Sequence, residues 1–298
     1  MDYSGAETPG SRLPRLQVYA ARPGAAAPER WSSPTPSNNR QRVNWTRREI
    51  AERLRGEISG GACLLAGIDH GFSFPVSYFA RYGLKTWPDF LADFTKYWPT
   101  HLDHVYVDFV RDGSLHRHGG GPRPGQRVGS ADEFRLTERW TSSAKSVFQL
   151  DGQGTVGKST HAGIPWLRWL REELGDAVHF WPFDGWTPPA GKAVIAEVYP
   201  SIFRNRYPRE GRSADEHDAY ATARWMAEMS ARGALDSYFA PPLTFAERAI
   251  ASLEGWILGC GERRAQVRSP RRRGRVRARL PQPRAAQPAR DHARPRHE

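Results

Sequence analysis

A chain of 298 residues with 39% hydrophobic residues is long enough to bury a core as one large domain or two small ones. No apolar run approaches the ~20 residues that cross a membrane, and the N-terminus lacks the apolar stretch of a signal peptide. Two cysteines cannot build a disulfide framework or a Cys-rich zinc site. We therefore expect a cytoplasmic protein without a membrane partner.

The net charge of +12 is concentrated at one end of the chain. Residues 261–298 hold 13 Arg and three acidic residues, a net of +10, which leaves +2 for residues 1–260. Almost no large apolar residue interrupts this segment, so it is predicted to be a disordered Arg/Pro-rich tail. An arginine tract can bind nucleic acid through phosphates. Its composition also fits a frameshift artefact of GC-rich DNA, and both interpretations stay open.

The chain before the tail divides into two parts. Residues 1–40 contain six Pro among many small residues and are predicted to be disordered, apart from a short edge strand near 16–20. Residues 41–260 show periodic apolar patterns and are predicted to form one folded domain.

The first regular elements lead to Asp69. Thr46 and Glu49 form a capping box that predicts a helix over 47–58. Residues 63–68 are an apolar run that predicts a buried strand, and Asp69 stands at its end. An acidic residue at this position is a candidate site residue, or an ordinary turn-capping carboxylate.

The next hundred residues are less regular. Strands are predicted over 72–79 and 105–110, and a helix is predicted to begin at Thr86. Residues 111–142 are rich in Gly, Arg and His, have no clear period and are predicted to form a long loop. Loops of that length are often functional.

A glycine-rich motif follows a predicted strand at 147–150. Residues 152–159, GQGTVGKS, match the P-loop pattern GxxxxGK[ST]. Because Pro165 disfavours a helix interior and is favoured at a helix start, we expect the next helix to begin there and not at the motif. We interpret the motif as a loop that turns Lys158 and His161 toward a phosphate, and a true P-loop is the alternative.

The segment 193–228 organises the rest of the domain. A strand is predicted over 193–199, with Glu197 inside its apolar run. An arginine-rich loop follows, and then a helix that opens at Asp215 and carries Asp218. Glu197 could instead pair with a nearby arginine, and Asp218 could be a helix-start carboxylate favoured by the helix dipole.

These elements predict a mixed α/β sheet flanked by helices, with strands at 63–69, 72–79, 147–150, 178–181 and 193–199. Neighbouring parallel strands would bring Asp69 and Glu197 together, with Asp218 laid over them by its helix. Clustered carboxylates favour Mg²⁺ or Mn²⁺, which activate water for phosphodiester hydrolysis. In this hypothesis Asp69, Glu197 and Asp218 hold the metal and act in catalysis with Lys158. The phosphate ligands are His161, Arg204 and Arg206.

Four stretches carry a resemblance: GIDHGFSFP at 67–75, VFQLDGQGTVGKSTHAGIPW at 147–166, AEVYPSIF at 196–203 and DEHDAYATA at 215–223. Together they resemble a bacterial family of unknown function whose members have been predicted to be RNase H-like nucleases. The resemblance covers roughly residues 41–258 and implies an RNase H-like fold, a metal-dependent nuclease and a nucleic-acid partner. The family's presumed acidic triad corresponds to Asp69, Glu197 and Asp218, and its glycine-rich string is a loop.

Three functions remain in competition. The first is the metal-dependent nuclease, with DNA or RNA as substrate. The second is an ATPase or kinase that uses Gly152–Ser159 as a P-loop. The third is an RNase H-like scaffold that binds nucleic acid without cutting it. The sequence decides neither the substrate nor the oligomeric state.

Overall fold

A computed structural model describes residues 1–35, 43–119, 123, 125–141 and 143–261. At its centre lie three parallel strands in the order β3-β5-β4: β3 (Leu65–Ile68), β5 (Ala193–Glu197) and β4 (Val178–Trp181). All three are short apolar runs, typical of strands buried on both faces. The expected α/β class, a sheet flanked by helices, is confirmed, and the predicted Arg/Pro-rich tail lies outside the described residues beyond Gly261.

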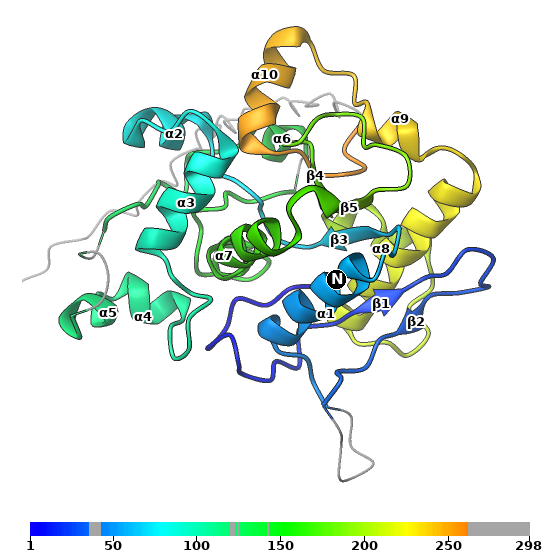
Figure 1. The fold of residues 1–298 in the computed structure, drawn as a ribbon, viewed down its shortest axis with the longest axis horizontal. Coiled ribbons are helices and arrows are strands. Elements are labelled where there is room, and N and C mark those ends of the chain that lie inside the picture. The colour runs from blue at the N-terminus through cyan, green and yellow to red at the C-terminus, as the bar shows by residue number, and fades with distance from the viewer. Residues whose placement is uncertain (36–42, 120–122, 124, 142, 262–298) are drawn as a thin grey trace, which may run out of the picture. The chain divides into compact units, whose positions relative to one another are not determined.

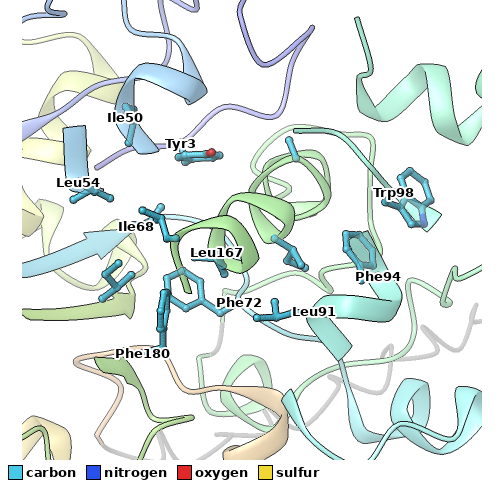
Figure 2. Packing of buried hydrophobic residues seen from close by; sticks show 14 of the residues in the cluster. Tyr3, Ile50, Leu54, Ile68, Phe72, Leu91, Phe94, Trp98, Leu167 and Phe180 are labelled. Carbon is cyan, nitrogen blue, oxygen red and sulfur yellow. The ribbon is translucent and has the colours of Figure 1, made fainter. Parts of the chain in front are cut away.

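Helices cover both faces of this sheet (Figure 1). Successive side chains of a strand point to opposite faces. Ala193 and Ile195 of β5 therefore join one core, with α1 (Arg47–Ser59), α3 (Trp87–Tyr97) and α7 (Gly157–Leu174). Figure 2 shows part of this core, with Ile68, Leu167 and Phe180 among its members. Val194 and Ala196 join the second core, beside residues of α8 (Ala214–Ala231).

The remaining regular elements of the described chain are short. The helices are α2 (Val76–Tyr82), α4 (Val107–Arg111), α5 (Ser114–Arg117), α6 (Leu136–Trp140), α9 (Leu235–Phe239) and α10 (Phe245–Glu254). Three 3-10 turns are η1 (Gly175–Ala177), η2 (Pro200–Ile202) and η3 (Arg204–Arg206). Two-residue strands β1 (Tyr19–Ala20) and β2 (Glu29–Arg30) pair antiparallel. None of the helices in these described ranges is long and apolar enough to cross a membrane.

Three of the predicted strands are wrong. Residues 72–75 are irregular, and Pro75 is the N-cap of helix α2. Residues 107–111 form helix α4, and residues 147–150 form no strand. Their apolar side chains are buried all the same, and a short apolar run does not distinguish a strand from a helix or a packed turn. The sheet is therefore three-stranded and parallel, not a five-stranded mixed sheet.

Helix α7 corrects another expectation, because it begins at Gly157 and runs through Pro165. Proline cannot donate to the carbonyl four residues earlier, which here belongs to His161. The hydroxyl of Thr100 donates to that carbonyl instead, at 2.8 Å, so the bond lost to proline is replaced from another segment. Close packing explains the glycine at position 163 of this helix, because a Cβ there would collide with the imidazole of His70.

The N-terminal segment is also ordered, against expectation. Scattered apolar side chains of residues 1–35 enter the core, with Leu16 fully buried. The buried guanidinium of Arg47 donates to the carbonyls of Ser4, Ala6 and Glu7, at 3.0, 2.6 and 2.7 Å. The prediction of disorder is wrong for this part because single tertiary contacts hold it and leave no periodic pattern. Residues 36–40 lie outside the described chain.

Candidate functional site

The candidate site lies at the carboxyl end of strands β3 and β5. Asp69 directly follows β3, and Ile68 is paired in register with Glu197 at the end of β5. In open parallel sheets, ligands bind outside the carboxyl ends of the strands. The predicted juxtaposition of Asp69 with the end of β5 is thus present in the structure.

Three aspartates near this edge influence one another electrostatically. Burial, followed by the charge of Asp218, raises the pKa of the partly exposed Asp69 to about 7, although a hydrogen bond with the Asp2 side chain acts in the opposite direction. The pKa of Asp2 is also raised, first by burial and then by the charge of Asp69. Burial raises the pKa of Asp218, whose side chain is 19% exposed. We call Asp2, Asp69 and Asp218 the aspartate cluster.

Basic groups border the aspartate cluster. The Met1 amino group donates to the Gly67 carbonyl at 2.7 Å, and burial lowers its pKa to about 6. Arg204 of η3 places Nη1 3.6 Å from Oδ2 of Asp218, and its side chain is 48% exposed. Arg206, on the same turn, is exposed. Arg204, predicted as a phosphate ligand, therefore pairs with Asp218 in this structure.

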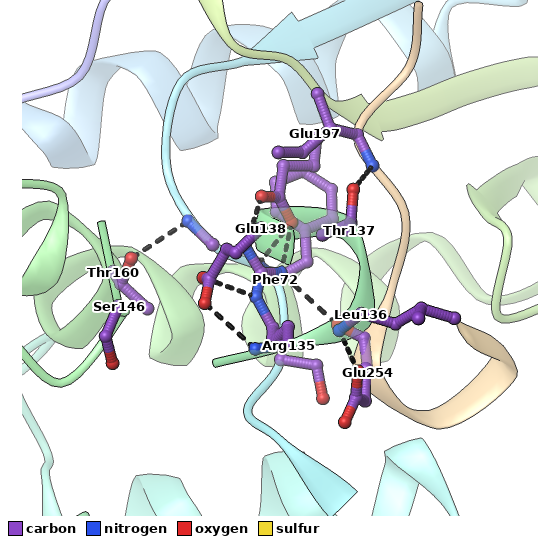
Figure 3. A network of polar contacts seen from close by, with 12 residues as sticks. Phe72, Arg135, Leu136, Thr137, Glu138, Ser146, Thr160, Glu197 and Glu254 are labelled. Carbon is purple, nitrogen blue, oxygen red and sulfur yellow. Dashed lines mark hydrogen bonds and ion pairs between the residues drawn. The ribbon is translucent and has the colours of Figure 1, made fainter. Parts of the chain in front are cut away.

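Glu197 does not join the cluster as a free ligand. Its Oε1 accepts from Nη2 of Arg135 at 2.6 Å, and its Oε2 accepts from Nη1 of Arg135 at 2.7 Å (Figure 3). The Phe72 amide also donates to Oε2, at 3.0 Å. Both oxygens of this buried carboxylate are occupied, so its assignment as a metal ligand is corrected to that of an ion-pair partner.

Arg135 is the centre of this buried network. Its Nε donates to Glu138 at 2.8 Å, and its Nη1 also donates to the Glu254 carbonyl at 3.2 Å. Burial is the largest single influence on the pKa of Arg135 and lowers it. The charges of Glu197 and Glu138, together with their hydrogen bonds, outweigh burial, so the pKa of Arg135 is raised overall. The network ties α6 and the segment after α10 to the site edge of β5. A glutamate paired with arginine was expected, but from the loop that follows β5.

Two predicted phosphate contacts are corrected. His161 is buried, and its Nδ1 donates to the Gly157 carbonyl at 2.8 Å while its ring packs edge-on against Trp98. It therefore faces the core, and burial lowers its pKa to about 4. The ammonium of Lys158 is partly exposed and is held by Asp108 at 2.8 Å and Asp151 at 3.3 Å. Its charge is already balanced by two carboxylates.

The P-loop motif is followed directly by a helix, which was not expected from the sequence. The strand that was predicted before the motif is absent. Residues 152–156 lead directly into α7, whose N-cap, Val156, supplies no side-chain hydrogen bond. A cleft of about 270 Å³ lies beside this loop, lined by Thr155, Lys158 and Ser159 together with Asp2. Gly154 and Val156 of the same stretch also line a small cavity of about 20 Å³.

The donor chemistry suits a hard divalent cation. No group of three or more His, Cys, Asp or Glu side chains within the described ranges has the arrangement of a metal site. Mg²⁺, however, is typically held by one or two carboxylates, with water and substrate phosphate in the other positions. Asp69 and Asp218, with Asp2 beside them, fit that limited role, whereas Glu197 does not.

Sequence reasoning missed Asp2 and Arg135. Asp2 lies in a segment whose composition resembles disorder, and no local pattern marks it. Arg135 lies in residues 111–142, which show no regular apolar spacing. The one local pattern there that involves Arg135 is its i, i+3 spacing with Glu138 at the start of α6. Their contacts join residues more than 60 positions apart, which no local pattern records.

Comparison with known proteins does not identify the chain: no protein-family model, no curated protein and no solved structure matches it. What can be said of its activity therefore depends on the chemistry of the residues described above.

Proposed function

We propose that this protein is a metal-dependent nuclease whose folded part is an RNase H-like domain. The observation that carries the proposal is the gathering of Asp2, Asp69 and Asp218 at the carboxyl end of β3, where Asp2 forms a β-bridge with Asp69, burial raises all three carboxyl pKa values, and the charge of Asp218 raises the pKa values of Asp2 and Asp69 further. Groups that destabilise each other in this way are typical of functional sites. A cation that neutralises them would relieve the repulsion.

In this proposal Asp69 and Asp218 hold Mg²⁺ or Mn²⁺, and Asp2 accepts a hydrogen bond from a water at the site. The ion supplies Lewis acidity to the phosphate and lowers the pKa of bound water. Arg204 neutralises Asp218 in the free protein and is released toward a substrate phosphate when Asp218 binds a cation. Arg206, which is exposed on the same turn, adds a second positive charge along the nucleic-acid backbone.

The buried ion pair of Arg135 and Glu197 has a supporting role. Because it fixes the end of β5 against α6, it holds the edge of the sheet at which Asp69 stands. A protein distinguishes RNA from DNA by contacts to the 2′-hydroxyl of the sugar, and these residues do not define such a contact. DNA and RNA are therefore both substrates to test.

The test is cleavage of DNA, RNA and hybrid substrates by the full-length chain with Mg²⁺ or Mn²⁺. Removing a carboxylate that holds the ion should slow cleavage at least about 100-fold, so Asp69→Asn should be nearly inactive. Asp132→Asn is the control, because Asp132 is exposed on the loop before α6. Equal cleavage rates for wild type and Asp69→Asn would contradict the proposal. Cleavage is measured at raised salt, which suppresses nonspecific binding by arginines.

A second candidate is a nucleotide-binding enzyme of the ATPase or kinase class. It is favoured by one observation: α7 begins at Gly157 immediately after the glycine-rich loop, and Lys158 and Ser159 line the 270 Å³ cleft. Against it stand the two carboxylates that already hold Lys158. Lys158→Ala should abolish ATP binding under this candidate and change nuclease turnover only modestly under the first. Metal binding without cleavage of any substrate would favour a nucleic-acid-binding scaffold.

A further inference from the structure

We propose that Lys145, not Lys158, is the lysine that binds substrate phosphate at the Asp69 site. The inference rests on the proposed nuclease function and adds a phosphate ligand that no sequence motif marks. It starts from the small cavity of about 20 Å³; the glycine-rich loop borders both this cavity and the 270 Å³ cleft. The walls of this cavity include Asp69, Lys145, Gly154 and Tyr199.

The cavity places Lys145 and Asp69 around one shared space. Its volume of about 20 Å³ is the space of roughly one water molecule or one phosphoryl oxygen. Lys145 and Asp69 line the same cavity, whereas Lys158 lines the separate, larger cleft.

Lys145 and the residues beside it are held in place by hydrogen bonds to other segments. Its Nζ donates to the Gln153 carbonyl at 2.6 Å, so the lysine bridges to the glycine-rich loop. The Tyr199 hydroxyl donates to the Ser143 carbonyl at 3.3 Å, and the Ser146 hydroxyl donates to the Glu133 carbonyl at 2.6 Å. These bonds anchor the chain on both sides of Lys145 before any substrate arrives.

The charge of Lys145 is available, unlike that of Lys158. An ammonium group has three donors, and Gln153 uses one of them. Within the described ranges no carboxylate pairs with Lys145, whereas Asp108 and Asp151 both pair with Lys158. Lys145 therefore has two donors left in the cavity that Asp69 also lines. A phosphate oxygen there could accept a hydrogen bond from Lys145 while it binds a metal held by Asp69. Such a donor also stabilises the negative charge on the phosphate oxygens during hydrolysis.

The direct test is affinity labelling of the full-length protein with pyridoxal 5′-phosphate, an anionic aldehyde. The aldehyde condenses with a lysine amine, and borohydride reduces the resulting imine to a stable adduct that mass spectrometry can map. The chain has only five lysines: Lys85, Lys96, Lys145, Lys158 and Lys192. We expect Lys145 to be labelled first and to be protected by inorganic phosphate. Labelling that is strongest at exposed Lys85, with no protection of Lys145, would overturn the proposal.

Kinetics with matched variants provide the second readout. Loss of a charge-assisted contact to phosphate should raise KM or lower kcat by about 10- to 100-fold in Lys145→Met. Lys145→Arg keeps the charge and should recover most of that loss, and Lys158→Met should have a smaller effect than Lys145→Met. Unchanged kinetics for Lys145→Met in an active nuclease would overturn the inference alone. Phosphate-protected labelling without cleavage of any nucleic acid would support the phosphate site and contradict the nuclease.

Discussion

Replacing Arg135 by methionine should destabilise the fold strongly. The side chain of Arg135 is 1% exposed and those of Glu197 and Glu138 are 4% and 1% exposed, so the substitution would leave two carboxylates buried without their cation. Removing one member of a buried ion pair costs about 3–5 kcal/mol. At about 2–4 °C per kcal/mol for a domain of this size, Tm should fall by roughly 6–20 °C.

Thermal and urea unfolding of the purified variants would measure this cost. The control is Arg168→Met, because Arg168 forms an exposed pair with Glu172 whose loss should cost only about 0.5 kcal/mol. Arg135→Met combined with Glu197→Met removes one of the unpaired charges and should be more stable than Arg135→Met alone. A loss below about 1 kcal/mol for Arg135→Met, similar to that of Arg168→Met, would refute the reasoning.

Two further predictions concern the buried face of α7. Thr100→Val should cost about 1–3 kcal/mol because it leaves the His161 carbonyl unsatisfied, and Thr100→Ser should retain most of the stability in the same urea titration. Pro165→Ala restores the helical donor and should reduce the cost of Thr100→Val. Since burial lowers the pKa of His161 to about 4 from 6.5, the unfolded chain binds more protons below pH 6.5. Stability should therefore fall by about 1–2 kcal/mol between pH 6.5 and 5 on account of His161, and His161→Phe should flatten the profile; an unchanged profile would contradict the assignment.

Local patterns predicted the part of the site that lies on regular elements. The apolar runs before Asp69 and around Glu197 are short and continuous, which is typical of buried parallel strands, and their pairing follows from that burial. The N-cap signals at Thr46 and Thr86 also predicted the starts of α1 and α3. In each case the information lies within a few residues of the element that it defines.

The sequence could not predict contacts that depend on distant segments. The Glu197 carboxylate could have bound a metal or paired with any arginine, and the partner proved to be Arg135, 62 residues earlier. Pro165 was expected to start a helix because a proline in the interior loses a hydrogen bond, and Thr100 supplies the replacement from 61 residues away. His161 follows a phosphate-binding motif in sequence, but the helical turn directs its ring into the aromatic core.

The measurement that tests the central claim most directly is Mn²⁺ binding by the full-length protein, followed by the electron paramagnetic resonance signal of the free ion. At pH 8, above the raised pKa of about 7, Asp69 is ionised and free to bind a cation. Wild type should bind about one ion per chain more than Asp69→Asn, and Glu197→Gln, if folded, should bind as wild type does. Equal Mn²⁺ binding by wild type and Asp69→Asn would contradict a metal site at the aspartate cluster.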